Sequence, residues 1–190
     1  MEQLEVLSWL VNKLEKTRIY YFITGSIASS YYGIPRFTHG IDIVLTIGEK
    51  DAGKVIHLFK DAGYISREGI NEALSDSGMF NFIHSETGMK VVFWVNRGDP
   101  FTKSCFDRVH KLEITESVSA VMASPEDVLL HKVYWHKLTP SERQIRDVQG
   151  IISVQGSRLD AEYIEKCAKE LGVEDEIRTL LAGNDLPNLT

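Results

Sequence analysis

The stretch ITGSIASSYYGIPRFTHGIDIVL (23–45) decides how this sequence is interpreted. It begins inside IYYFIT (19–24), a run of β-branched and aromatic residues that is typical of a strand. Gly25 and Ser26 interrupt that run, and the small residues that follow favour a short helix. The stretch ends in IDIVLTI (41–47), a second apolar run. We therefore predict a strand, a Gly-Ser turn, a helix and a second strand.

A single acid, Asp42, lies inside the otherwise apolar second strand. Because successive side chains of a strand alternate between its faces, Gly40 and Asp42 share one face. Ile41 and Ile43 share the other, which we expect to be the core face. Positions 40 and 42 lie roughly 7 Å apart in a strand, so two carboxylates there could converge on a divalent cation. Only one of the two positions carries a carboxylate.

Composition limits the class of protein. The chain has 190 residues, of which 43% are hydrophobic and 25% charged, and a net charge of −6 that gives no general attraction to nucleic acid. Cys105 and Cys167 are too few for a disulfide framework and favour two structural thiols in a reducing cytosol. No apolar run approaches the ~20 residues of a membrane helix. We expect a cytoplasmic protein with no membrane partner.

The chain divides into a mixed part and a helical part. Before position 124 the patterns predict helices over 2–16 and 49–64, a hairpin of MFNFIHS with MKVVFWV, a helix at FTKSCFDRV and a broken extended segment, KLEITESVSAVMA. Beyond it, they predict four helices, over 125–138, 140–154, 160–171 and 174–182. We predict an α+β fold: a mixed β-sheet with flanking helices in residues 1–123, and a C-terminal helical region, 124–190, packed on that core.

The opening stretch resembles the polymerase-β-like nucleotidyltransferase superfamily, whose signature is an apolar strand, a Gly-Gly or Gly-Ser turn, a helix and then Asp-x-Asp on the next strand. The segments GMKVVFWVNRGDPF, ASPEDVLLHKVYWHK and SERQIRDVQGII resemble its small bacterial branch, which includes abortive-infection and type IV toxin-like proteins. The resemblance covers roughly residues 20–175. It implies a nucleotidyltransferase-like sheet and the Mg²⁺-dependent transfer of a nucleotide monophosphate from an NTP to a hydroxyl group.

The resemblance also assigns a phosphate site. Gly25 and Ser26 would hold the triphosphate, because glycine lets the backbone approach phosphate and the start of a helix attracts anions. In the helical half, Lys132 and Arg143 are expected near the phosphates or the acceptor. The alternative for Lys132 is structural, as an ion pair with Asp147. For Trp135 we favour a place in the core between the helices.

Two of the three acids that hold metal ions in this superfamily are replaced. The first aligns with Gly40 and the third with Val92, so Asp42 is the remaining catalytic carboxylate and by itself a weak metal ligand. We predict that Asp42 and Val92 lie on adjacent strands of one mixed sheet, facing the same side. Asp42 then either caps local amides or pairs with Arg36 or Lys90, or it retains some metal or nucleotide binding.

Three functions stay open at this stage. The first is a nucleotidyltransferase that acts on a protein, RNA or small-molecule acceptor. The second is a relative with weak or no catalysis that still binds nucleotide or a partner. The third is a toxin-antitoxin or defence component that acts through protein contact, for example with an antitoxin. The lost carboxylates favour the second. The sequence names neither the acceptor nor the preferred base nor the oligomeric state.

Overall fold

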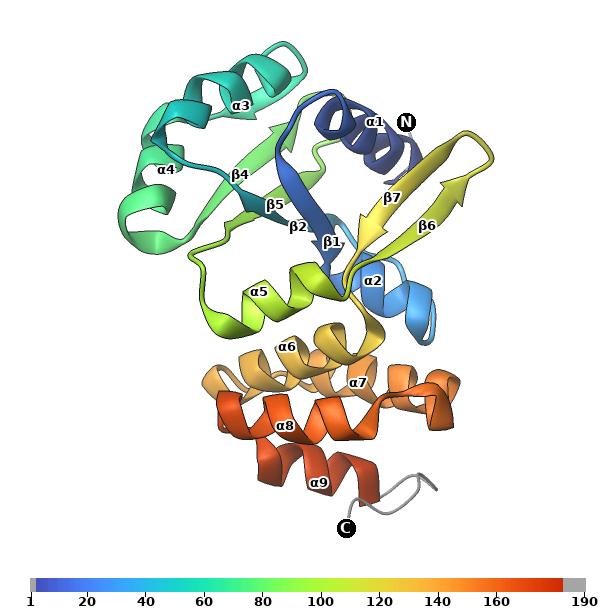
Figure 1. Cartoon of the computed structure of the whole chain (residues 1–190). Coiled ribbons are helices and arrows are strands. Elements are labelled where there is room, and N and C mark those ends of the chain that lie inside the picture. The colour runs from blue at the N-terminus through green and yellow to red at the C-terminus, as the bar shows by residue number, and fades with distance from the viewer. Residues whose placement is uncertain (1–2, 183–190) are drawn as a thin grey trace. The chain divides into compact units, whose positions relative to one another are not determined.

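The computed structural model describes residues 3–182, which form two compact units (Figure 1). The first unit comprises the residues up to Thr24 together with Thr38–Met122. The second comprises Gly25–Phe37 and the residues from Ala123 onward. The segment between the first two strands thus groups with the helical part of the chain, which the sequence did not indicate. A domain boundary at residue 123 stays a prediction.

The first unit is built on a mixed sheet, as predicted. In the described part of the chain it has seven strands in the order β3-β4-β5-β2-β1-β7-β6. Strand β2 runs antiparallel to β1 and parallel to β5, and β1 runs parallel to β7. The strands are β1 Tyr20–Thr24, β2 Gly40–Thr46, β3 Gly63–Ile65, β4 Met79–His84, β5 Lys90–Val95, β6 His110–Thr115 and β7 Val118–Met122.

One face of this sheet carries the core of the unit. Ile41 and Ile43 are fully buried there, as strand alternation predicts. Helix α1 (Gln3–Glu15) and helix α3 (Ala52–Phe59) cover this face, and Trp9 of α1 lies with its ring centroid 5.9 Å from those of both Phe59 and Phe82. These aromatic contacts add to the burial of apolar surface that holds the helices on the sheet.

Helix α5 (Pro100–Asp107) packs against the other face. The Phe106 ring meets Phe22 of β1 edge-on, with 4.7 Å between the ring centroids. Asp99 is the N-cap of this helix, and its carboxylate accepts a hydrogen bond from the backbone N–H of Thr102. Sequence PFTKSCFD therefore forms the helix expected of it. Cys105 is buried on α5, and within residues 3–182 neither it nor Cys167 forms a disulfide.

The predicted helix over 49–64 is wrong in length. A 3-10 turn, η1 (Glu49–Asp51), precedes α3, which ends at Phe59, and the chain then forms the short strand β3. Gly63 permits this pairing, because a Cβ there would lie 2.0 Å from the carbonyl oxygen of Ile83 on β4. Helix α4 (Arg67–Glu72) and a π-helical segment, η2 (Ala73–Ser77), were not predicted either.

The second unit is helical. Its elements are α2 Gly25–Tyr32, α6 Pro125–Leu138, α7 Glu142–Gln155, the 3-10 turn η3 Gly156–Arg158, α8 Ala161–Leu171 and α9 Glu174–Ala182. The four helices predicted beyond position 124 are confirmed, although α7 begins two residues late. The N–H of Ser141 bonds the His136 ring, which keeps that residue outside the helix. None of the described helices is long and apolar enough to cross a membrane.

The predicted core position of Trp135 is also wrong. Its surface is 40% exposed, whereas the buried residues of α6 end at Val133. The last turn of α6 therefore extends past the face on which the helix packs. An aromatic side chain in that turn meets solvent despite its apolar character.

Two helices of the second unit approach closely at Gly33, which follows α2. A Cβ on Gly33 would lie 2.8 Å from the carbonyl carbon of Gly150 and from the backbone nitrogen of Ile151 on α7. We expect Gly33→Ala to lower the free energy of unfolding by about 1–3 kcal/mol, because backbone atoms must move apart. Gly53→Ala in α3 is the control. Its new methyl meets nothing within 4 Å and should stabilise by up to about 1 kcal/mol. Urea denaturation of both variants checks this, and an unchanged midpoint for Gly33→Ala would contradict it.

Candidate functional site

The first part of the predicted site lies on strands β2 and β5. These strands pair in parallel with Asp42 directly opposite Val92 and with Gly40 opposite Lys90. The prediction that Asp42 and Val92 lie on adjacent strands and face the same side is therefore confirmed. Val92, the position that the sequence analysis aligned with the third acid, is thus beside Asp42 and carries a branched apolar group.

Asp42 is half-buried beside the apolar side chain of Val92 and the indole of Trp94. Its Oδ1 accepts a long hydrogen bond, 3.4 Å, from the indole Nε1 of Trp94. Asn81 of β4 lies opposite Val92 on the next strand, and its buried Oδ1 accepts no hydrogen bond from any described residue. Within residues 3–182 no group of three His, Cys, Asp or Glu side chains could hold a metal ion. The residues around Asp42 do not fit a two-metal site.

The second part of the predicted site lies in the helical unit and centres on Asp147 of α7. Its Oδ1 accepts a hydrogen bond from Arg36 Nε at 2.7 Å. Its Oδ2 accepts from Arg36 Nη2 at 2.8 Å and from Lys132 Nζ at 2.7 Å. The Lys132–Asp147 ion pair is thus confirmed, and Gln144 accepts a further bond from the same ammonium group at 3.0 Å. The sequence analysis considered Arg36 only as a partner of Asp42 and missed its pairing with Asp147.

The local sequence explains how Arg36 reaches the start of α2. Gly25 has a φ of +64°, a left-handed conformation that favours glycine, and α2 begins there. The helix ends before Pro35, and the chain then turns back so that the N–H of Arg36 bonds Ser30 Oγ. Arg36 Nη2 donates to Ser26 Oγ at 2.8 Å. The Gly-Ser turn is therefore tied to Asp147 through one guanidinium group.

Charge and burial give this cluster its electrostatics. The side chains of Lys132 and Asp147 are 7% and 6% exposed, and that of Arg36 is 27% exposed. Burial alone would raise the pKa of Asp147, but the hydrogen bonds and positive charges of Arg36 and Lys132 lower it to about 2. The hydrogen bond to Asp147 likewise raises the pKa of Arg36 above its ordinary value. Two cations and one carboxylate leave the cluster with a net positive charge.

The structure places the other predicted phosphate residues as follows. Lys132 is buried and its ammonium group is held by Asp147 and Gln144. Arg143 lies exposed on the first turn of α7. The role of both residues toward phosphate stays a prediction.

The Asp147 cluster predicts a specific pH dependence of stability. The folded pKa of about 2 lies below the ordinary value of 3.8, so the ionised carboxylate stabilises the fold fully above pH 3.8. That contribution is lost as the pH falls toward 2. Asp147→Asn cannot titrate, so the stability difference between the two proteins should shrink by about 2 kcal/mol over this range. Urea denaturation at several pH values measures it, and a constant difference would contradict the assignment.

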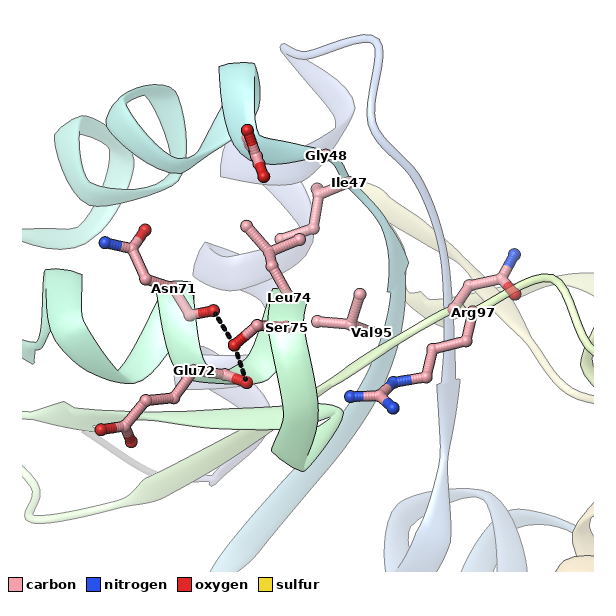
Figure 2. A pocket seen from close by; sticks show the side chains of 10 residues that line it. Ile47, Gly48, Asn71, Glu72, Leu74, Ser75, Val95 and Arg97 are labelled. Atoms are coloured by element: carbon pink, nitrogen blue, oxygen red, sulfur yellow. Dashed lines mark hydrogen bonds between the residues drawn. The ribbon is translucent and has the colours of Figure 1, made fainter.

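A separate hollow of about 900 Å³ lies in the first unit (Figure 2). Its lining comes from the chain just after β2, from α4 with η2, and from the end of β5. Ile47, Leu74 and Val95 form its apolar part, and Arg97 donates to the carbonyl groups of Ala73 and Asp76 at its edge. None of the predicted site residues lines it. It adjoins the ends of β2 and β5 opposite to those that carry positions 40 and 90.

Comparison with known proteins shows the fold. No family model and no curated protein sequence matches this chain. Among solved structures, it is similar to the antibiotic-resistance factor ANT(2″)-Ia, with a TM-score of 0.61, 12% identity, and coverage of 95% of this chain and 94% of that one. It is also similar to an antigenic nucleotidyltransferase-like protein from Paracoccidioides brasiliensis, with a TM-score of 0.58, 15% identity, and coverage of 97% and 94%.

A third solved structure, the lincosamide antibiotic adenylyltransferase LnuA with lincomycin bound, has a TM-score of 0.56 and 16% identity. The match covers 81% of this chain and 98% of LnuA. The mixed sheet with its flanking helices is therefore a nucleotidyltransferase fold, as the sequence predicted. At these identities the likeness establishes the fold, and function has to be argued from the residues of this chain.

Proposed function

We propose that this protein binds an NTP through the Gly25–Ser26 turn and that its transfer of a nucleotide monophosphate to a hydroxyl acceptor is weak or absent. The proposed loss of catalysis rests on the register of β2 and β5, which places Asp42 beside the apolar Val92. Position 40, on the same strand face as Asp42, is a glycine and has no side chain to bind metal. One carboxylate is a poor site for two cations, since Mg²⁺ is usually bound by one or two carboxylates together with phosphates.

Local chemistry supports the phosphate site. The left-handed Gly25 lets the backbone approach an anion, and the first amides of α2 follow it directly. The hydroxyl of Ser26 and the net positive cluster of Arg36 and Lys132 with Asp147 add donors and charge within the same unit. Each of these features favours an anionic ligand.

The comparisons support an NTP as the nucleotide that enters this site. LnuA is an adenylyltransferase, and another structure of ANT(2″)-Ia contains adenylyl-2″-tobramycin. Those acceptors belong to those proteins. For this chain a protein, an RNA or a small molecule remains a candidate acceptor, and a toxin-antitoxin role through protein contact stays a prediction. The function that we favour is nucleotide binding with little catalysis.

Replacing Ser26 tests the phosphate site. Ser26→Ala should weaken ATP binding by about 1.5–3 kcal/mol, the usual contribution of a hydrogen bond to a charged group. Calorimetric titration with ATP, with and without Mg²⁺, measures this. Ser66→Ala is the matched control, because its hydroxyl caps α4 through the N–H of Gly69 and should affect stability alone. Unchanged ATP affinity in Ser26→Ala would make the turn structural.

Restoring the missing acids tests the proposed loss of catalysis. A Cβ at Gly40 meets only the carbonyl oxygen of Lys90, at 3.7 Å, so Gly40→Asp is sterically tolerated. Combined with Val92→Asp it should create Mg²⁺ affinity at Asp42. Without the ion the three carboxylates repel one another and lower the midpoint of thermal unfolding, and Mg²⁺ should restore it.

The control for this variant keeps the volume and removes the charge. Gly40→Asn with Val92→Asn should show no Mg²⁺-dependent rise in the melting midpoint. Strong Mg²⁺-dependent nucleotide transfer by the unmodified chain, abolished by Asp42→Ala, would contradict the proposed function, because it would show that Asp42 needs neither of the missing acids.

A further inference from the structure

The guanidinium group of Arg36 has one donor left for a ligand. Arginine carries five N–H groups in a rigid fork. Nε and the two hydrogens of Nη2 serve Asp147 and Ser26, and Nη1 makes a long bond of 3.4 Å to the carbonyl of Phe37. Within the described residues the fifth N–H, also on Nη1, has no acceptor. Since the side chain is 27% exposed, this donor is open to a ligand from solvent.

The same contact prepares the hydroxyl of Ser26. Its oxygen accepts the hydrogen bond from Arg36, so its own hydrogen must point away from the guanidinium group. In the described part of the chain that hydrogen bonds no other group. Arg36 therefore fixes Ser26 as a donor, and both side chains offer an N–H or O–H to one acceptor-rich ligand at the start of α2.

The anchor of Arg36 explains why the group stays in this position. Asp147 accepts two parallel hydrogen bonds from Arg36, a geometry that fixes the plane of the guanidinium group. A single Arg–Asp pair would be neutral and would attract an anion weakly. Lys132, which binds Oδ2 of the same carboxylate, restores a net positive charge.

We propose that Arg36 binds the phosphate groups of the nucleotide directly, together with Ser26, and that Asp147 is a positioning residue that holds Arg36 in place. This inference rests on the proposed function and names the residue that recognises the triphosphate. The ligand class is a polyphosphate, because the donors converge on oxygen anions and nothing in the cluster selects a base. Affinity should therefore depend on Arg36 equally for ATP and for inorganic triphosphate.

The first experiment measures the affinity of Arg36 variants for these two probes. Arg36→Ala should weaken the binding of ATP and of inorganic triphosphate by the same factor, roughly ten- to hundredfold. Arg36→Lys keeps the charge but loses the fork, so its affinity should be intermediate. Arg178→Ala, which removes an exposed arginine of α9 in the same unit, is the control for charge and should leave both affinities unchanged.

The second experiment tests whether Asp147 acts through Arg36. Asp147→Asn should weaken ATP binding in the unmodified chain and have little further effect in the Arg36→Ala background, because the group that it positions is gone. If Asp147 had a purely structural role, the losses of ATP affinity caused by Asp147→Asn and Arg36→Ala would add. If Asp147→Asn does not fold, Asp147→Glu, which keeps the charge but moves the carboxylate away from the guanidinium group, replaces it in the same cycle with Arg36→Ala and should also be non-additive.

The outcomes separate this inference from the proposed function. If the unmodified chain binds neither ATP nor inorganic triphosphate, the proposed function fails and this inference with it. If the chain binds both while Arg36→Ala binds them equally well, only this inference is overturned. A loss of ATP affinity without a loss of triphosphate affinity would also overturn it, since Arg36 would then recognise the nucleoside.

Discussion

The buried carboxylate of Asp147 is the constraint on which the second unit depends. A charge with 6% side-chain exposure is strongly unfavourable unless cations and hydrogen bonds match it. Asp147 obtains this match from Arg36 and Lys132, with a weaker bond from Ser29. Three segments of the chain therefore have to meet at the carboxylate of Asp147: the turn after α2, the middle of α6 and the middle of α7.

Stability alone does not account for such a cluster. Replacing a buried ion pair by apolar residues of similar volume is often neutral or stabilising, so the pair is weak support for a stabilising role. Its geometry has a different consequence, because it holds the guanidinium group of Arg36 on the hydroxyl of Ser26. A rigid donor array at the start of a helix is what recognition of phosphate requires. We therefore interpret the cluster as preorganisation of a binding site.

Much of this fold could be predicted from local patterns, because apolar runs, alternation and capping residues act over short distances. The Ser124–Pro125 start of α6 and the alternation around Asp42 are examples. The Lys132–Asp147 pair was also predictable, as the two residues carry opposite charges on consecutive helices. Strand β3 was not, since its formation depends on pairing with β4 rather than on its own three residues.

The parts of the site that were missed depend on contacts distant in sequence. Arg36 and Asp147 are 111 positions apart, and no local pattern joins them. Trp135 shows the reverse error: apolar character suggested a core position, but the packed face of α6 ends at Val133. Both cases show that the chemistry of a residue can be read from its type, whereas its partners follow from the packing of whole elements.

The two units differ in the charged groups that they offer to a ligand. In the first unit, the apolar Val92 lies beside Asp42, and the indole of Trp94 donates a hydrogen bond to one oxygen of that carboxylate. In the second unit, Arg36 and Lys132 together carry one more positive charge than Asp147 neutralises. A triphosphate is normally neutralised by bound metal ions together with side chains. Where carboxylates that would recruit the metal are absent, cations of the protein have to supply more of that neutralisation. The absence of carboxylates at positions 40 and 92 is thus compatible with the proposed phosphate recognition, because in that proposal binding depends on the cations of the cluster, whereas transfer would depend on charge stabilisation at the reacting oxygens.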